Sequence, residues 1–254
     1  MSDMILLKIG GSVLTDKSRP STMREDNIKM VARQIAAAKT SHLILVHGAG
    51  SFGHPQVVKY LSKGLSASGL WRTHLAVCSL NTAFVDELQS QGAATLPIHP
   101  LNTMTLDAGR IAHFDTSALN LMLDNKISPV LHGDVVMDRS NGFNVLSSDQ
   151  IVAFLAQKMR PKKIGVGSDV EGIIYANKKL KYLDPDQFEK YRHEIQGSRS
   201  TDVTGGMLHK AVELVEIAKS GIESIIFDAT CDGNVTRFLT SNDNIGTVIS
   251  AEKK

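Results

Sequence analysis

The sequence has little cysteine, few aromatic residues and no long apolar run. Its two cysteines, Cys78 and Cys231, show no metal-binding or redox spacing and indicate a reducing compartment, so we expect a cytoplasmic protein. No apolar run is long enough to span a bilayer, and a strand follows the first residues directly, so we expect neither a membrane segment nor a signal peptide. The net charge of +2 gives no indication of nucleic-acid or membrane binding.

Acidic residues are absent from one long stretch of the chain. No Asp or Glu occurs between Asp26 and Asp86, whereas Lys or Arg occurs there six times. An N-terminal half that handles an anionic substrate would show this bias, and so would chance together with solvated surface lysines. Both interpretations stay open on this observation alone.

The central motif is the glycine-rich segment 47–54, which follows the apolar run 43–46. The apolar run predicts a buried parallel strand, and the glycines let the backbone turn and present N–H groups to an anion. The spacing is that of two nucleotide-binding motifs, but neither fits. The dinucleotide fingerprint lacks its acidic residue about twenty positions later, and His54-Pro55 replaces the Lys and Ser/Thr of a P-loop. An anion cradle and an ordinary tight turn both remain possible.

Apolar runs and helical patterns alternate along the chain, which predicts an α/β fold with an open, mainly parallel sheet. Strands are expected near residues 4–9, 43–46, 94–98, 127–131, 163–169, 224–227 and 245–249, with a hairpin joining 135–137 to 143–146. Helices are expected to follow a cap at Asp26 and to cover 55–63, 71–88, 116–124, 149–159, 207–219 and a short segment from 234. Segment 64–69 is expected to be a loop, and any lobe boundary is expected near Arg160.

The helix from Trp71 to about Leu88 carries a stripe of residues at helical spacing. The stripe consists of Trp71, Leu75, Cys78, Thr82, Val85 and Leu88. Such a stripe usually faces the core, but its small and polar members also suit the wall of a cavity. We therefore expect this helix to line the pocket for an apolar part of the substrate, with Leu75 as a bulky wall residue.

Several lysines and glycine turns fall where strands end or helices begin. Lys8 lies inside an apolar strand and precedes Gly10-Gly11-Ser12. A lysine buried there needs an anion as its partner. The alternative is an edge strand from which the lysine side chain reaches solvent. Lys17 follows in a nearby loop. The other such segments are His132-Gly133-Asp134, the strand ending at Asp169, and Gly205-Gly206 with Lys210. Cations and backbone dipoles at one sheet edge are what phosphoryl transfer requires.

Five short motifs follow one another along the chain: Lys-x-Gly-Gly-Ser, His-Gly-x-Gly, His-Gly-Asp, Ser-Asp-Val-x-Gly and Gly-Gly-Met-x-x-Lys. With these motifs in this order, the sequence resembles the amino acid kinase superfamily over nearly the whole chain. Within it, Gly-x-Gly-Ser-Phe-Gly-His is similar to the archaeal-type isopentenyl phosphate kinase family. The resemblance implies a three-layer α/β/α sandwich, with an N-terminal lobe (1–160) for the phosphoacceptor and a C-terminal lobe (161–254) for ATP. It also implies a cytoplasmic homodimer that phosphorylates isopentenyl phosphate in mevalonate-pathway isoprene biosynthesis, with Mg²⁺ carried by ATP and no metal site of its own.

The resemblance also implies roles for individual residues. Lys8 and Lys210 match the lysines that grip the transferring phosphoryl group, Lys17 an additional transition-state lysine, Asp169 the aspartate that orients the lysines, and His54 the histidine that binds the acceptor phosphate. The implied substrate-binding residues are Gly48, Ala49, Gly53, His54, Gly133, Asp134 and Asn144. The implied ATP-binding residues are Lys8, Gly10, Gly11, Ser12, Gly50, Asp169, Gly172, Tyr175, Gly205, Gly206 and Lys210. Ala49 stands where many relatives have glycine and should be tolerated if its φ is negative.

Other functions remain possible for the same fold. A fosfomycin-type kinase, or another small phosphate or phosphonate kinase, would share the fold and a histidine, whereas a UMP kinase would need a second nucleobase pocket that nothing in the sequence indicates. A non-catalytic nucleotide-sensing module would have no need to keep the three lysines together with Asp169. An acceptor phosphate is already anionic at neutral pH, so His54 would act as a hydrogen-bond donor and not as a general base.

Overall fold

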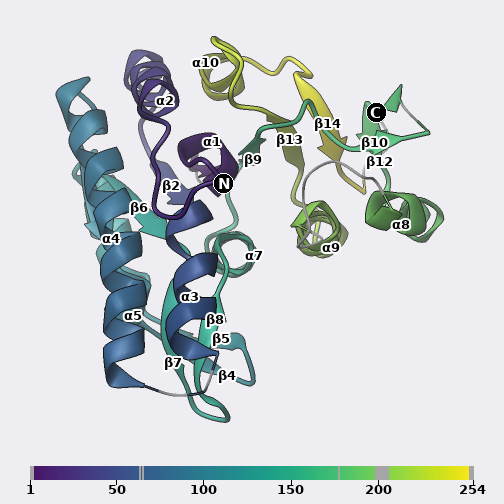
Figure 1. The fold of residues 1–254 in the computed structure, drawn as a ribbon. Helices are drawn as coiled ribbons and strands as arrows, with labels where there is room; N and C mark the ends of the chain where they lie inside the picture. The colour runs from purple at the N-terminus through teal and green to yellow at the C-terminus, as the bar shows by residue number, and fades with distance from the viewer. Residues whose placement is uncertain (1–2, 63, 65, 177, 198–205, 252–254) are drawn as a thin grey trace.

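The main sheet has eight strands in the order β12-β14-β13-β9-β1-β2-β6-β3 (Figure 1). The computed structural model describes residues 3–62, 64, 66–176, 178–197 and 206–251. The strands are β1 (Ile5–Ile9), β2 (Leu43–His47), β3 (Thr95–Ile98), β6 (Ser128–His132), β9 (Lys163–Ser168), β12 (Tyr182–Leu183), β13 (Ser224–Asp228) and β14 (Gly246–Ile249). Every neighbouring pair is parallel except β13 with β14. The predicted mainly parallel sheet is therefore confirmed.

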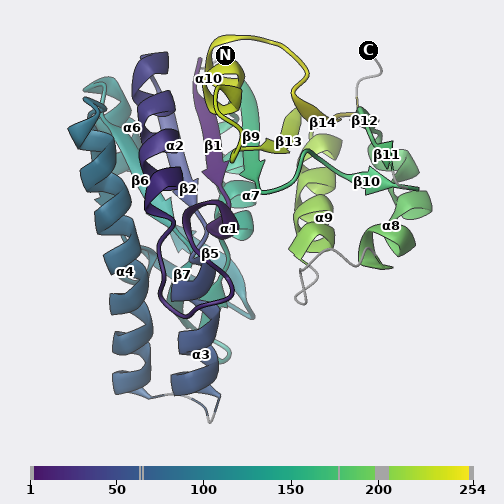
Figure 2. The same ribbon diagram turned by 45° about the horizontal axis from the view of Figure 1, so that its top comes forward.

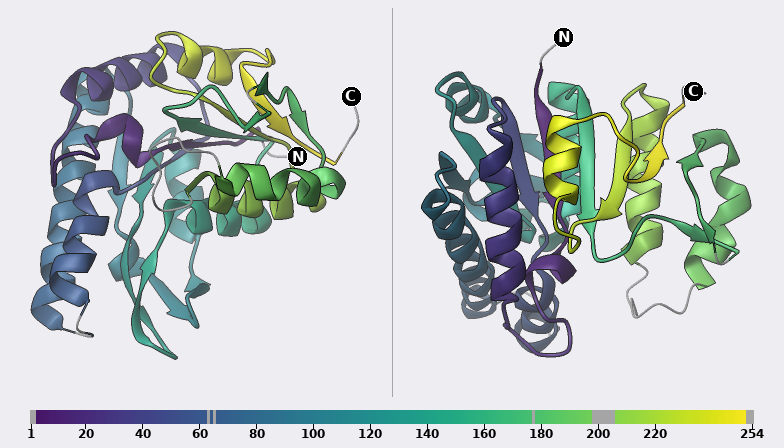
Figure 3. Two further views of the ribbon diagram at one scale, coloured as in Figure 1. Left: turned by 45° about the vertical axis from the view of Figure 1, so that its right-hand side comes forward. Right: turned by 90° about the horizontal axis from the view of Figure 1, so that it is seen from above.

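Helices cover both faces of this sheet, which makes three layers (Figures 2 and 3). On one face, α2 (Glu25–Ala38), the C-terminal half of α4 (Ala67–Ser90) and α10 (Asn234–Thr240) share a core with Ile5, Leu7 and Ile9 of β1. On the other, α6 (Ser117–Asp124), α7 (Ser148–Met159) and α9 (Gly206–Lys219) share a core with Leu6. Strands covered on both faces read as continuous apolar runs, which is why the central strands β9, β1, β2 and β6 could be predicted. The two-residue strand β12 was not predicted. The α/β/α sandwich is confirmed.

A second sheet of four strands, in the order β5-β4-β7-β8, extends away from the main one beside α3 and α4 (Figure 1). Its strands are β4 (Met104–Asp107), β5 (Arg110–Phe114), β7 (Asp134–Asp138) and β8 (Gly142–Leu146). The predicted hairpin is β7–β8, and it turns at Gly142, whose φ is 77°. Strands β4 and β5 were not predicted. The remaining elements are α1 (Gly11–Leu14), η1 (Gly50–Phe52), α3 (His54–Leu61), α5 (Pro100–Thr103), β10 (Ile174–Tyr175), β11 (Lys178–Lys179), η2 (Pro185–Gln187) and α8 (Phe188–Gly197).

Three local predictions were wrong. Helix α2 begins at Glu25 after Arg24, so Asp26 does not cap the helix. It lies in the first turn, where its negative charge interacts favourably with the helix dipole. Segment 64–69 is not a loop throughout, because α4 begins at Ala67 and the Ser66 hydroxyl accepts a hydrogen bond from the Gly69 backbone.

The predicted stripe of α4 faces the core only at its C-terminal end, where Val85 and Leu88 are buried. Trp71 is 58% exposed, Leu75 is 49% exposed, and Thr82 is exposed as well. The buried face instead carries Leu70, Thr73, His74, Val77, Leu80, Asn81, Phe84, Val85 and Leu88. Leu75 is therefore not a wall residue of any interior pocket.

Residues 161–254 contribute four strands, β9, β12, β13 and β14, to the same sheet as the N-terminal half. A division into an acceptor lobe and an ATP lobe at residue 160 stays a prediction. Within the described ranges, no helix combines the length and apolar character needed to cross a membrane.

Candidate active site

The carboxyl ends of β9, β1, β2 and β6 lie side by side and carry glycine turns. Beyond the strands, backbone hydrogen bonds continue from Gly10 N to Gly167 O (2.7 Å), from Gly48 N to Ile9 O (3.0 Å) and from Gly133 N to His47 O (3.1 Å). The predicted turns are therefore fixed relative to one another by the sheet itself. Open parallel sheets bind ligands at this edge.

Two of these turns touch, and the contact requires glycine. A Cβ on Gly11 would lie 2.4 Å from Gly50 N, and a Cβ on Gly48 would lie 2.6 Å from Gly11 N. Gly50 has a φ of 51°. Buried Thr15 links the same segments, because its hydroxyl donates to Gly11 O at 2.7 Å and accepts from Ser51 N at 3.0 Å. The glycine-rich segment is thus part of a packed backbone platform and not an isolated turn.

Lys8 is buried in a central strand and points toward α7. The alternation of β1 puts Lys8 on the same face as Leu6, and its ammonium donates a hydrogen bond of 2.5 Å to Asp149 Oδ1. Burial lowers the pKa of Lys8 to about 8, although the Asp149 carboxylate favours the charged form. An edge-strand lysine reaching solvent is excluded, since strands β9 and β2 flank β1.

Asp169 brings two further lysines into the same site. Its carboxylate accepts hydrogen bonds from the hydroxyls of Ser12 at 2.7 Å and Ser168 at 3.3 Å. Burial alone would raise the pKa of Asp169, but the Ser12 hydrogen bond and the charges of Lys17 and Lys210 lower it below its ordinary value. Lys210 also disfavours the charged form of Lys8. The three lysines predicted from sequence and Asp169 are therefore electrostatically coupled.

One cavity of about 820 Å³ lies at this edge of the sheet. Lys8, Lys17 and Lys210 line it together with the glycine turns and the N-terminus of α7. We call this part the phosphoryl end. Its described lining residues are Lys8, Gly10, Gly11, Ser12, Lys17, Gly50, Ser51, Ser147, Ser148, Asp149, Gln150, Lys210 and Glu213.

The rest of the cavity, here called the acceptor end, is bounded by α3, α4, β7, β8 and the β4–β5 turn. Its described lining residues are Gly48, Ala49, Gly53, His54, Pro55, Val57, Thr73, Val77, Ala108, Gly109, Arg110, Gly133, Asp134, Val135, Asn144, Val145 and Leu146. His54 is the first residue of α3, and Ala49 has a φ of −71°, as tolerance of its methyl group requires. Val57, Val77, Val135 and Val145 make part of this end apolar.

Most of the predicted site residues meet in this cavity, but some do not. Asp169 reaches it through Ser12, and Gly206 begins α9, the helix that carries Lys210. Gly172 and Tyr175 are not among its lining residues. A Cβ on Gly172 would lie 2.5 Å from Thr247 Oγ1, and the Tyr175 ring packs on Tyr191 with centroids 4.7 Å apart. Gly205 lies outside the described residues.

Sequence reasoning missed three lining residues, Asp149, Arg110 and Glu213. Asp149 is the partner of Lys8, and it lies in the first turn of α7, which begins with a capping box between Ser147 and Gln150. The β4–β5 turn contributes Arg110, which forms an ion pair of 2.7 Å with Glu213 of α9. The capping-box spacing at residues 147–150 indicates the start of α7 in the sequence. No short-range pattern indicates the ion pairs of Lys8 with Asp149 and of Arg110 with Glu213.

Four histidines lie behind the acceptor end. Buried His47 and His132 each face the carbonyl of the following glycine through Nδ1, at 3.1 Å, and burial lowers the pKa of both imidazoles. His74 Nδ1 lies 2.7 Å from Asp134 Oδ2, and that hydrogen bond raises the pKa of His74 to about 10. Burial, with the charge of His74, lowers the pKa of His99. His74 is therefore the charged member of the group at neutral pH.

Comparisons with known proteins show the family of this chain. The model of the amino acid kinase family matches residues 3–228. Isopentenyl phosphate kinase of Methanocaldococcus jannaschii is 35% identical over 93% of this chain and 95% of its own length. The enzyme of the same name from Methanothermobacter thermautotrophicus is 35% identical over 98% and 100%, respectively. A solved structure described as isopentenyl phosphate kinase superposes with a TM-score of 0.84 at 32% identity, covering 97% of this chain and 100% of the other. The chain belongs to the amino acid kinase family.

Proposed function

We propose that this protein transfers the γ-phosphoryl group of ATP to isopentenyl phosphate, which yields isopentenyl diphosphate and ADP. The observation that carries the proposal is the two-part cavity, in which a cationic end with glycine turns adjoins an end with apolar walls. Relatives with the printed name isopentenyl phosphate kinase, 35% identical over nearly the whole chain, support the same reaction. The product would serve isoprenoid biosynthesis.

The phosphoryl end suits the transferring group. In the transition state, negative charge spreads over the oxygens of the γ-phosphoryl group, and the protein contributes mainly positioning and positive charge. Lys8, Lys17 and Lys210 would supply that charge, with Asp169 keeping Lys17 and Lys210 in place. Backbone N–H groups of Gly11 and Gly50 would contact phosphate oxygens of ATP.

The acceptor end suits a phosphate monoester with a short apolar tail. His54 would donate a hydrogen bond to the acceptor phosphate, with the turn from Gly48 to Gly53 beside it. Val57, Val77 and Val145 would contact the hydrocarbon tail. An acceptor oxygen then attacks the γ-phosphorus, and no proton has to be removed from it first, since the phosphate is already anionic.

Each carboxylate among the described lining residues of the cavity has a basic partner. Asp149 is paired with Lys8, Asp134 with His74, and Glu213 with Arg110. A magnesium site needs carboxylate oxygens that are free to bind the ion. We expect the reaction to require Mg²⁺ that enters bound to the oxygens of ATP. Assembly as a homodimer, an archaeal-type mevalonate pathway and a cytoplasmic location are further parts of the proposal.

The test is a panel of acceptors offered with Mg·ATP. The panel contains isopentenyl phosphate, dimethylallyl phosphate, fosfomycin and UMP, and kcat/KM is measured for each. The apolar acceptor end predicts that isopentenyl phosphate has the highest value. A higher value for fosfomycin or UMP would reject the proposal, and failure to phosphorylate any acceptor would favour a nucleotide-sensing module.

A further inference from the structure

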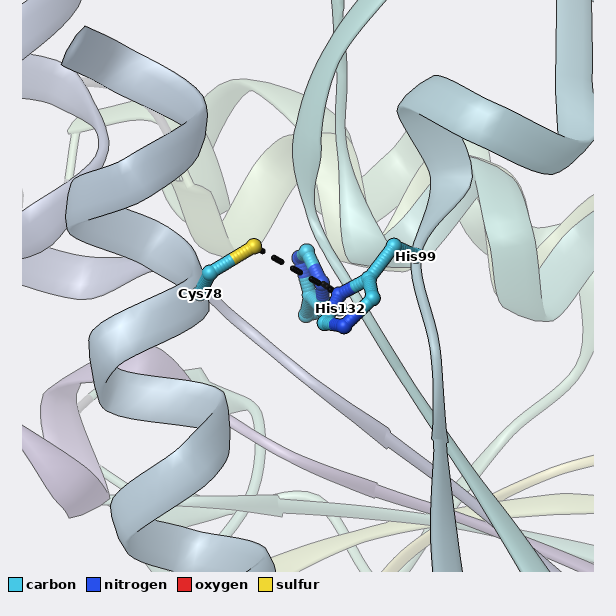
Figure 4. Close-up of side chains that lie close together, drawn as sticks. All are labelled: Cys78, His99 and His132. Atoms are coloured by element: carbon cyan, nitrogen blue, oxygen red, sulfur yellow. Dashed lines mark hydrogen bonds between the residues drawn. The ribbon is translucent and has the colours of Figure 1, made fainter. Parts of the chain in front are cut away.

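We propose that Cys78, His99 and His132 form a zinc-binding site behind the acceptor end of the cavity. Cys78 comes from the middle of α4, His99 precedes α5, and His132 ends β6 (Figure 4). One ligand atom from each, the sulfur and two imidazole nitrogens, lies within 4.8 Å of the others. Thiolate and imidazole are the ligands that Zn²⁺ prefers in proteins.

Two of the distances between these atoms can be compared with those around a tetrahedral zinc ion. Zinc bonds of about 2.3 Å to sulfur and 2.05 Å to nitrogen imply sulfur–nitrogen distances of about 3.6 Å and nitrogen–nitrogen distances of about 3.3 Å. Cys78 Sγ lies 3.5 Å from His99 Nδ1, which already fits. His99 Nδ1 lies 2.9 Å from His132 Nε2, so these two rings would have to separate by about 0.4 Å.

The hydrogen bonds around the cluster orient the lone pair of His132. His132 Nδ1 faces the Gly133 carbonyl at 3.1 Å and must carry the hydrogen of that contact, which leaves the lone pair on Nε2 facing His99. A second ring nitrogen that donates to a backbone carbonyl is the usual arrangement of a histidine bound to zinc. His99 Nδ1 donates the hydrogen of its contact with His132 Nε2, and it could bind zinc once that proton is on its other ring nitrogen. Partial exposure of Cys78 and His99 leaves a path by which an ion could enter.

His74 backs the cluster as a positioning residue. Its Nε2 lies 3.3 Å from Cys78 Sγ, while its Nδ1 lies 2.7 Å from Asp134 Oδ2. Asp134 in turn lines the cavity, so the metal site and the acceptor end share one carboxylate–imidazole pair as a wall. With three protein ligands, the fourth position of the ion would be open to water.

The test measures metal binding directly and does not depend on kinase turnover. Tag-free protein is treated with a chelator and titrated with Co²⁺, which substitutes for zinc and absorbs light. One Co²⁺ per chain, a sulfur-to-cobalt charge-transfer band, and loss of that band on adding Zn²⁺ are expected. Zn²⁺ should also raise the melting temperature, because binding favours the folded state. Absence of the charge-transfer band would overturn the proposal, whatever the acceptor panel shows.

Two substitutions and a matched control locate the site. Cys78→Ser and His99→Ala should each weaken Zn²⁺ binding by at least about 10–100-fold. Cys231→Ser, at the exposed cysteine, should leave the affinity unchanged. Circular dichroism without metal checks folding, and the partly exposed His99 provides a second measurement if Cys78→Ser is unstable. Equal affinity in wild-type protein and a folded Cys78→Ser or His99→Ala variant would show that the cluster is only a hydrogen-bonded network.

Discussion

The two ends of the cavity are held in place by different parts of the fold. The phosphoryl end is made of the ends of parallel strands, whose backbones are tied to one another by hydrogen bonds such as Gly10 N to Gly167 O. The acceptor end is made of side chains from α3, α4 and the second sheet, including Val77 and Val145. One end therefore depends on backbone geometry, and the other depends on which side chains the helices and hairpin present.

This difference has a functional consequence. A substitution leaves the backbone donors of the strand ends in place, whereas it changes the shape of a helix face at once. We therefore expect the chemistry to reside at the phosphoryl end and the choice of acceptor to reside at the acceptor end. Substitutions at the first end should reduce turnover with every acceptor. Substitutions at the second should change the ranking of acceptors and leave ATP binding intact.

The largest effect is expected at Lys8. Lys8→Met removes a cation from beside the transferring phosphoryl group, and loss of one such transition-state contact typically costs about 10²–10³ in kcat. Steady-state kinetics with isopentenyl phosphate give kcat, and calorimetry checks that ATP still binds. The loss should be equal for isopentenyl and dimethylallyl phosphate. These acceptors differ in their hydrocarbon tails, and Lys8 lies at the phosphoryl end of the cavity, away from the tails.

The control for Lys8 uses its partner. Lys8→Met leaves Asp149 without the ion pair that it makes in the wild type, which destabilises the fold on its own account. The double variant Lys8→Met with Asp149→Asn should recover the melting temperature and should not recover kcat. If kcat returns together with the melting temperature, Lys8 supports the fold and does not act on the phosphoryl group.

A smaller and more selective effect is expected at His54, the first residue of α3. His54→Ala removes a charge-assisted hydrogen bond to the acceptor phosphate, worth about 1.5–3 kcal/mol, or roughly 10–100-fold in kcat/KM for isopentenyl phosphate. The KM for ATP should change little. An equal change in the KM values of the two substrates would show that His54 does not act on the acceptor alone, and unchanged kinetics would make it an ordinary turn residue.

The pKa of Lys8 predicts a pH dependence of the phosphoryl end. Burial lowers this pKa from its ordinary 10.5 to about 8, so the free enzyme loses the charge of Lys8 as the pH rises through 8. The value of kcat/KM for ATP should then fall by up to about tenfold per pH unit above 8. Lys8→Arg keeps the charge and should remove this decline. Parallel profiles for the two proteins would assign the decline to another group.

Burial of Lys8 makes activity and stability change in opposite directions as the pH rises above 8. Between pH 8 and 10.5 the unfolded chain holds a proton that the folded chain has released, so the Lys8 contribution to the free energy of unfolding rises with pH in that window.

The sequence predicted the phosphoryl end better than the acceptor end, and the reason is physical. Apolar runs that end in glycine report a buried strand and its turn locally, so β1, β2 and β9 and their turns could be located. The ion pair between Lys8 and Asp149 joins residues 141 positions apart, and no local pattern records it. The same holds for Cys78, whose histidine neighbours His99 and His132 come from elements that meet only in the folded chain.

The α4 helix shows how a helical pattern can mislead. Its exposed residues Trp71 and Leu75 are large and apolar, while its buried face includes the polar His74 and Asn81. Polar side chains can be buried when they are hydrogen-bonded, as His74 is to Asp134, so the true face carries a weak apolar signal. The predicted stripe therefore followed the exposed side in the first half of the helix, although its last members Val85 and Leu88 are buried. The expectation that this helix lines the cavity holds through Thr73 and Val77.

The smallest effect is expected at Val77, and it tests the acceptor end alone. Val77→Ala removes two methyl groups from the cavity wall, worth at most about 1.6 kcal/mol, or roughly 15-fold in kcat/KM for isopentenyl phosphate. The added space should favour geranyl phosphate, because a closed apolar wall limits chain length by overpacking. Leu75→Ala is the matched control, since Leu75 lies on the exposed face of the same helix. The ratio of kcat/KM for the two acceptors should shift in Val77→Ala and stay constant in Leu75→Ala. A constant ratio in both variants would mean that α4 does not touch the acceptor's tail, and the choice of acceptor would then rest on α3 and the β7–β8 hairpin.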